Sequence, residues 1–209
     1  VDIDYPYLSN YPHLTPCVRE GELYVVGYNY FEHYFDYVNL SGGKHFSVEM
    51  QREGADGVLT PGRYWVLENG IVCQTQVGIV ALDMEGKVRH RVSVKELVTP
   101  DDIYLIRPRG AAMGNYDYEG SLGSQCFIPL SPLNKEADVA IGKVYDADTR
   151  SLELLSALYP EAVKALFQVN SLTMPRINAL NADRIIYNFP YSSKVYQYDR
   201  QTQETLVMD

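Results

Sequence analysis

The sequence predicts an all-β protein of the β-propeller type, with about four blade-like repeats that form part of a larger ring. One pattern occurs at residues 23–48 and again at 184–207: an apolar run, a short break, an alternating aromatic strand, a polar turn and another strand. The chain has 18 Tyr against 6 Phe and 1 Trp, and Tyr favours strands. Repeats of ~40–60 residues with several antiparallel strands are typical of propellers, whose small sheets complete their cores by stacking.

The repeats are predicted from alternation of apolar and polar residues with a period of two. The predicted blade-like units are 20–50, 63–98, 103–155 and 178–208. The similarity extends upstream, because 13–26 and 171–187 share a Leu-Thr pair, a nearby proline and a polar turn. The β-branched apolar runs at 23–27, 71–75 and 184–188 are predicted to be inner or middle strands of successive blades, buried and antiparallel within each blade, with no two of them paired in one sheet.

Two segments interrupt the strand pattern. Residues 158–167, "LYPEAVKALF", carry Pro160 followed by good helix formers, which predicts a short helix between blades. Residues 107–124 are rich in Gly and lack apolar periodicity, which predicts a long connecting loop. Long loops on the rim of a scaffold often carry function.

Composition excludes several classes of protein. The chain of 209 residues is 46% hydrophobic and 22% charged, as expected for one globular domain or two small ones, and the propeller pattern favours one domain over 1–209. Its net charge of −9 repels phosphate backbones, so no nucleic-acid partner is expected. The sequence contains no run of ~18 apolar residues, so no transmembrane segment is predicted. The opening "VDIDYPYLSN" is not a signal peptide, which fits a cytosolic chain, a mature secreted chain or a shortened one.

Metal and cofactor sites are not predicted, and no cofactor is expected. The histidines are scattered without ligand spacing: His13, His33, His45 and His90. The cysteines form no C-x-x-C pair and are expected to be small buried thiols: Cys17, Cys73 and Cys126. Asp146 and Asp148 have the spacing of a calcium loop but lack its other ligands, so a turn is the favoured interpretation.

The aromatic segments are the best candidates for ligand binding. Residues 28–37 and 115–120 combine Tyr and Phe with Asn, Asp and Glu, a chemistry that can hold a sugar ring or a peptide. For 28–37 the favoured alternative is packing within and between blades. The loop 107–120 owes little to core packing and is predicted to form a ligand or partner surface, with five residues as its site: Arg107, Arg109, Tyr116, Asp117 and Tyr118.

The strand and turn signatures "QREGADGV" (51–58), "GIVALDMEGKV" (78–88), "LYPEAVKALF" and "DRIIYNFPYSSKVYQYDRQTQETL" resemble one family. This is the propeller-like domain of unknown function in many predicted lipoproteins of Gram-negative gut commensals. The resemblance covers most of the chain and implies a six-bladed propeller-like fold, a longer chain, a location in the cell envelope (periplasm or outer-membrane surface) and a lipid anchor outside this sequence. The family has no established catalytic residues, so the resemblance implies none in this sequence.

Two functional classes follow. The first is a non-catalytic binding or assembly module of the cell envelope that recognises a glycan, a peptide or a partner protein on a propeller face. The second is a lactonase-, glycosidase- or lyase-like enzyme with its site at the central channel. The first is favoured because no His or carboxylate recurs at equivalent positions of the repeats.

Overall fold

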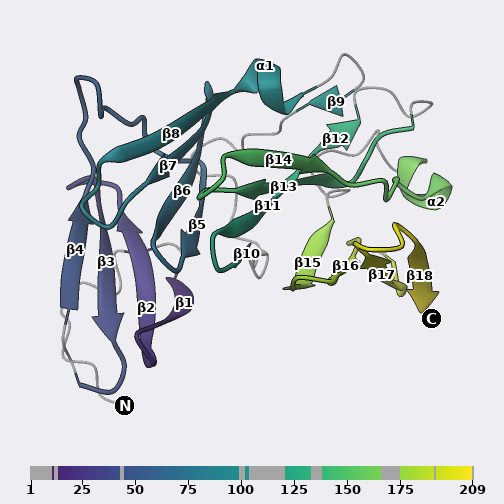
Figure 1. Ribbon diagram of the computed structural model, residues 1–209, viewed down its shortest axis with the longest axis horizontal. Coiled ribbons are helices and arrows are strands. Elements are labelled where there is room, and N and C mark those ends of the chain that lie inside the picture. The colour runs from purple at the N-terminus through teal and green to yellow at the C-terminus, as the bar shows by residue number, and fades with distance from the viewer. Residues whose placement is uncertain are drawn as a thin grey trace. The chain divides into compact units, whose positions relative to one another are not determined.

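The computed structural model describes residues 11, 14–42, 45–98, 102–103, 121–132, 138–165, 175–190 and 192–208. They belong to two compact units, residues 1–91 and 92–209, and each unit is described by itself. The described residues form mostly antiparallel strands (Figure 1), arranged in four four-stranded sheets.

The first sheet lies in the first unit and follows the chain in the order β1-β2-β3-β4. Its strands are β1 (Leu14–Arg19), β2 (Glu22–Asn29), β3 (Tyr34–Asn39) and β4 (His45–Glu49). Val26 and Tyr28 of β2 lie on the same face as Phe35 and Tyr37 of β3, because alternate residues of a strand share a face. That face enters the apolar core of the unit.

The second sheet has the order β5-β6-β7-β8. Its strands are β5 (Arg63–Leu67), β6 (Gly70–Thr75), β7 (Gly78–Leu82) and β8 (Val88–Ser93). Every residue of β6 and β7 is buried, so both faces of these strands are covered, which explains the apolar runs at 71–73 and 79–82. Ile71, Cys73 and Val80 share the core with the first sheet.

The second unit contains the third and fourth sheets. The third has the order β10-β11-β13-β14, with β10 (Ser121–Leu122), β11 (Gln125–Pro129), β13 (Gly142–Asp146) and β14 (Ser151–Leu154). The fourth has the order β15-β16-β17-β18, with β15 (Arg176–Leu180), β16 (Arg184–Asn188), β17 (Val195–Asp199) and β18 (Thr205–Met208). A two-stranded ladder joins β9 (Asp102–Ile103) to β12 (Ser131–Pro132). The core between these sheets includes Phe127, Val144, Ile185 and Tyr187.

The hairpin after the third strand has the same construction in all four sheets. At or just after the end of that strand an Asn or Asp side chain accepts hydrogen bonds on Oδ1 from two backbone N–H groups of the following turn. The four capping residues are Asn39, Asp83, Asp146 and Asp199. Side chains of this type mimic a backbone turn. This recurrent polar residue is the physical basis of the polar turn that recurs in the sequence. The expectation that no carboxylate recurs at equivalent positions of the repeats is therefore wrong, since Asp83, Asp146 and Asp199 do so, each as an acceptor of turn hydrogen bonds.

Helices are short. The sequence prediction of a helix over 158–167 is wrong at its start, since α2 covers only Glu161–Lys164, with Pro160 at the N-cap. Leu158 forms a β-bridge with Ala140, and the Tyr159 N–H donates to the Val139 carbonyl, which keeps this stretch extended. Residues 166–167 lie outside the described part of the chain.

A second helical turn, α1 (Val94–Leu97), was not predicted. Its start is held by Glu96, whose Oε1 accepts hydrogen bonds from both the N–H and the hydroxyl of Ser93. The spacing S-x-x-E is a helix-start signal that the sequence contains, although one turn is too short to produce a visible periodicity.

The all-β prediction is confirmed, and so is the assignment of the apolar runs. Residues 23–27, 71–75 and 184–188 lie in β2, β6 and β16, each the second strand of a separate sheet. The predicted burial is complete only for 71–75, since Leu23 and Arg184 are exposed at the ends of the other two runs. The four sheets match the four predicted repeats with shifted bounds: the first sheet begins at Leu14, and β9 pairs with β12 instead of joining the third sheet. Ring closure and the total number of blades remain predictions.

Candidate functional site

The predicted site residues lie outside the described part of the chain. Arg107, Arg109, Tyr116, Asp117 and Tyr118 all fall within 104–120, so the ligand surface predicted there stays a prediction. Two hollows lined by described residues of the second unit are alternative candidate sites.

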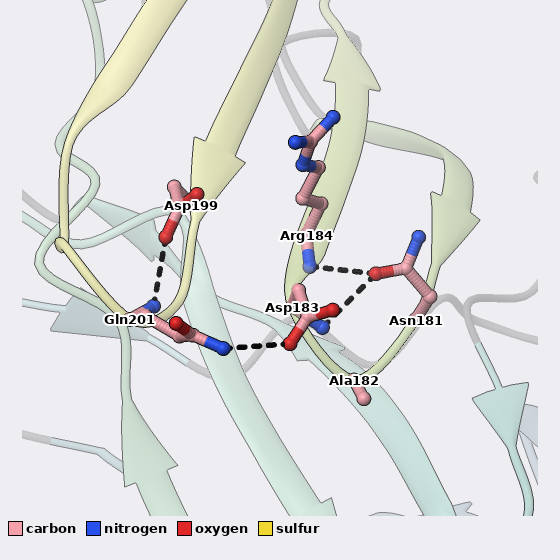
Figure 2. Close-up of a pocket in the computed structure, with 6 residues that line it drawn as sticks. All are labelled: Asn181, Ala182, Asp183, Arg184, Asp199 and Gln201. Atoms are coloured by element: carbon pink, nitrogen blue, oxygen red, sulfur yellow. Dashed lines mark hydrogen bonds between the residues drawn. The ribbon is translucent and has the colours of Figure 1, made fainter.

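The first hollow is polar and open (Figure 2), with a volume of about 490 Å³. Two turns of the fourth sheet form it, the one between β15 and β16 and the one between β17 and β18. Its lining residues are Asn181, Ala182, Asp183, Arg184, Asp199 and Gln201. Figure 2 shows that Gln201 and Asp183 bridge the two turns through a hydrogen bond from Nε2 to Oδ1 of 2.9 Å.

Its polar groups are largely engaged in holding the turns. Asn181 Oδ1 accepts from the N–H groups of Asp183 and Arg184, at 3.0 and 2.7 Å. Hydrogen bonds from the N–H groups of Thr202 and Gln201 lower the pKa of the Asp199 carboxyl. The polar hollow is therefore accounted for by turn structure.

The aromatic segment 28–37 is mainly a packing element. Phe35 lies between Tyr28 and Tyr64, with ring centroids 5.0 and 4.9 Å away, and Tyr37 stacks on Phe46 at 4.6 Å. Phe31 is the exception, because it lies in the β2–β3 turn and is 81% exposed. The favoured interpretation of this segment, packing within the fold, is confirmed for Tyr28, Phe35 and Tyr37.

His33 is a buried histidine at that turn, with a positive φ of 67°. Its Nε2–H donates to the Val58 carbonyl at 2.9 Å, so Nδ1 of the neutral ring accepts from the Tyr28 hydroxyl at 2.6 Å. Burial lowers the pKa of His33 below its ordinary value of 6.5, outweighing the hydrogen bonds to backbone carbonyls, and the positive charge of Arg52 lowers it further. His33 thus links β2 to the segment that follows β4.

Acidification is expected to loosen this turn. Since the folded state favours neutral His33, its contribution to stability is complete above pH 6.5 and decreases as the pH falls below that value, where the unfolded chain takes up the proton first. After correction for intrinsic exchange rates, hydrogen exchange of the amides of 28–37 should become faster as the pH falls from about 7.5 to 5.5. His33→Asn, which tolerates positive φ and cannot titrate, should remove this pH dependence. An equal change in the variant would contradict the assignment to His33.

The thiols and the Asp146 turn have structural roles. Cys73 and Cys126 are buried in strands, Cys17 is half-buried, and all three are free. Burial raises the pKa of Cys17 to about 11 despite Arg19, which leaves it a poor nucleophile. Burial acts to raise the pKa of Asp146, but hydrogen bonds from the Thr149 N–H, Gln125 and other donors outweigh it and lower that pKa. The turn interpretation of Asp146 is thus confirmed.

The second hollow is an apolar groove with a volume of about 340 Å³. We call it the α2 groove, because α2, the segment after β16, β17 and β18 form its walls. Its lining residues are Pro160, Ala162, Val163, Pro190, Ser192, Lys194, Tyr196 and Val207. No local sequence motif signals this groove, since four separate segments contribute one to three residues each.

The floor of the α2 groove is Tyr196, which belongs to a packed aromatic cluster. Tyr196 stacks on Tyr187 with ring centroids 5.2 Å apart and planes 14° apart, and its edge meets Phe189 at 5.5 Å. The Tyr159 ring lies against Phe189 with centroids 5.3 Å apart, and the Tyr159 hydroxyl donates to the Leu130 carbonyl at 2.6 Å. A floor fixed by packed rings and a buried hydrogen bond is largely preformed, as ligand sites usually are.

Charge at the helix side of the α2 groove is slightly negative. Lys164 Nζ is buried and donates to Asp138 at 2.6 Å and to Glu161 at 2.9 Å, while both carboxylates are exposed. These two hydrogen bonds raise the pKa of Lys164, so the ammonium stays charged. One ammonium facing two carboxylates leaves a local surplus of one negative charge, and Lys194 supplies a cation among the lining residues.

Within the described ranges, no group of three or more His, Cys, Asp or Glu side chains converges as a metal site would. No helix in the part of the chain that the structure describes is long and apolar enough to cross a membrane.

Comparisons with known proteins reveal similarity of fold only. No protein family matches the sequence, and no curated protein matches it either. The fold is similar to the crystal structure of a member of the DUF4221 family from Bacteroides vulgatus, with a TM-score of 0.56 and 9% sequence identity. The match covers 94% of this chain and 57% of that one, so the chain spans little more than half the length of its structural neighbour.

The neighbour supports the resemblance in its coarser form. It is a member of a domain-of-unknown-function family, as the sequence signatures predict, and at 9% identity it informs on fold alone. The propeller ring, the lipoprotein character and the location in the envelope remain predictions.

Proposed function

We propose that this protein is a non-catalytic binding or assembly module of the cell envelope, built as a β-propeller that continues beyond these four blades. Three of the four sheets are formed by strands consecutive along the chain, and each third strand ends in the same side-chain-capped turn. This repetition supports the assignment of the sheets to blades. The longer structural neighbour supports a larger ring.

The observation that carries the binding function is the α2 groove. Its apolar walls and preformed aromatic floor suit the apolar face of a ligand, with Lys194 and Ser192 at hand to orient polar groups. A peptide, a partner protein or the apolar face of a sugar would each bury against such a surface. The envelope location rests on the resemblance to predicted lipoproteins, and fractionation of cells that express the complete gene tests it.

Filling the α2 groove should abolish binding without harming the fold. Ala162 is an exposed residue that lines the groove on α2, so Ala162→Arg places a long charged side chain in it. Ligands selected with the purified chain from a peptide library and a glycan array should bind Ala162→Arg at least about tenfold more weakly, which is ~1.4 kcal/mol.

Ala165→Arg is the matched control. Ala165 is exposed, lies at the C-terminal end of the same helix and does not line the groove, so this variant should bind as the parent does. Failure to select any ligand, or equal binding by all three proteins, would contradict the assignment of binding to the groove.

A further inference from the structure

The last strand of the fourth sheet is an edge without protective charge. β18 pairs with β17 alone among the described strands, and its apolar side chains are exposed: Leu206 58%, Val207 46% and Met208 37%. The other outer strands of four or more residues carry charged residues, such as Glu49 in β4 and Glu153 in β14. Charged side chains are a usual means of preventing an edge from pairing with another strand. β18, with the sequence TLVM, has none.

The register shows which backbone groups of β18 face outward. The Asp199 N–H donates to the Glu204 carbonyl at 2.9 Å, so this pair is hydrogen-bonded. Bonded and non-bonded pairs alternate in an antiparallel ladder, which makes Tyr198 with Thr205 and Tyr196 with Val207 the non-bonded pairs. The N–H and C=O groups of Thr205 and Val207 therefore point away from β17, and no described residue pairs with them as a strand.

This edge is continuous with the α2 groove. Val207 lines the groove, and it lies opposite Tyr196, which forms the floor. A segment that paired with β18 could therefore place an apolar side chain in the groove while its backbone bonds to Thr205 and Val207. A further blade of the ring would stack on the face of the sheet and would leave this edge open.

We propose that β18 accepts an extended segment of another protein as an additional antiparallel strand, with alternate apolar side chains and basic flanking residues. This inference rests on the proposed binding function and identifies its ligand class. A second copy of the chain is disfavoured, because two molecules that each carry a net charge of −9 repel each other. The same net charge favours Lys or Arg at the flanks of the incoming segment, outside the groove, where Lys194 already supplies a cation. Backbone pairing supplies affinity and the groove supplies selectivity.

The probe is a fluorescent peptide, Lys-Thr-Val-Thr-Val-Thr-Val-Lys, with blocked ends, and the control peptide has proline in place of the central valine. Val207→Pro removes an outward N–H, a position where an edge strand tolerates proline. Val207→Thr retains that N–H and a side chain of similar shape. Fluorescence anisotropy should show binding of the probe to the parent, and Val207→Thr measures how much of that binding depends on the Val207 side chain in the groove. Binding to Val207→Pro should be at least tenfold weaker than binding to Val207→Thr, and the control peptide should not bind.

A second measurement needs no variant and holds even if Val207→Pro does not fold. In the parent protein, the probe should slow hydrogen exchange at the Thr205 and Val207 amides, since these donors would enter the new ladder. No protection, or equal binding by Val207→Pro, would overturn strand addition. If light scattering shows a dimer of the parent and a monomer of Val207→Pro, the strand that pairs with β18 belongs to a second copy of the chain and not to another protein. If the library ligands fail to bind Ala162→Arg but still bind Val207→Pro, the groove is a binding site and strand addition to β18 is wrong.

Discussion

Phe35→Ala is expected to lower the free energy of unfolding of the first unit by about 3–5 kcal/mol, the usual cost of removing a buried aromatic ring. The Phe35 side chain is fully buried, and its ring lies against Tyr28 and Tyr64, which belong to two different sheets. Its loss leaves a cavity between the sheets that backbone hydrogen bonds on both sides prevent from closing.

Phe31→Ala provides the comparison, because the same residue type occurs four positions earlier and is 81% exposed. Its effect should remain within about 0.5 kcal/mol. Urea unfolding followed by tyrosine fluorescence measures both variants. Similar losses for the two would mean that residues 28–37 do not divide into a buried core and an exposed turn as described. If Phe31→Ala loses ligand binding while its stability is unchanged, the turn at Phe31 is a ligand-binding element.

Gly86→Ala is the second substitution with a large expected effect, about 2–5 kcal/mol from two separate causes. Gly86 has a φ of +78° in the turn between β7 and β8, a conformation that disfavours any side chain. An added Cβ would also lie 1.8 Å from the carbonyl oxygen of Glu49 in β4. Because that atom belongs to the backbone, the turn itself must move.

Gly54→Ala separates the two causes. Gly54 has a similar φ of +85°, but an added Cβ would meet nothing within 4 Å. It should therefore cost only the conformational term, about 1 kcal/mol. Thermal unfolding of the two variants measures the difference, which is the cost of the clash. Equal midpoints would show that the turn at Gly86 shifts freely away from β4.

The strands were predictable where burial imposes a simple pattern. β6 and β7 are covered on both faces, so their sequences are mostly apolar, with Gln74 and Thr75 as buried polar exceptions at the end of β6. β16 alternates, with Ile185 and Tyr187 buried and their neighbours more exposed. Local side-chain chemistry was equally informative at Asp146, because Asp favours turns through bonds to its own following N–H groups.

Prediction failed where distant contacts decide the outcome. Helix propensity favoured a start at Leu158, but the partners of Leu158 and Tyr159 lie at Ala140 and Val139, almost twenty residues away. The α2 groove was also invisible, since Ala162, Pro190, Tyr196 and Val207 are ordinary residues until folding brings them together. A site recognised by residue type alone, such as the Arg and Tyr of 107–118, relies on composition and not on geometry.

The order of strands in the sheets bears on how the chain folds during synthesis. All ladders of the first sheet join neighbours in the sequence, and they are complete once Glu49 is available. The second sheet likewise requires nothing beyond Ser93. A ribosome adds about 5–20 residues per second, whereas a hairpin forms in microseconds, so each of these sheets can form before the next has been translated. The turn-capping side chains Asn39 and Asp83 would then act first as local nuclei that close each last hairpin on the nascent chain.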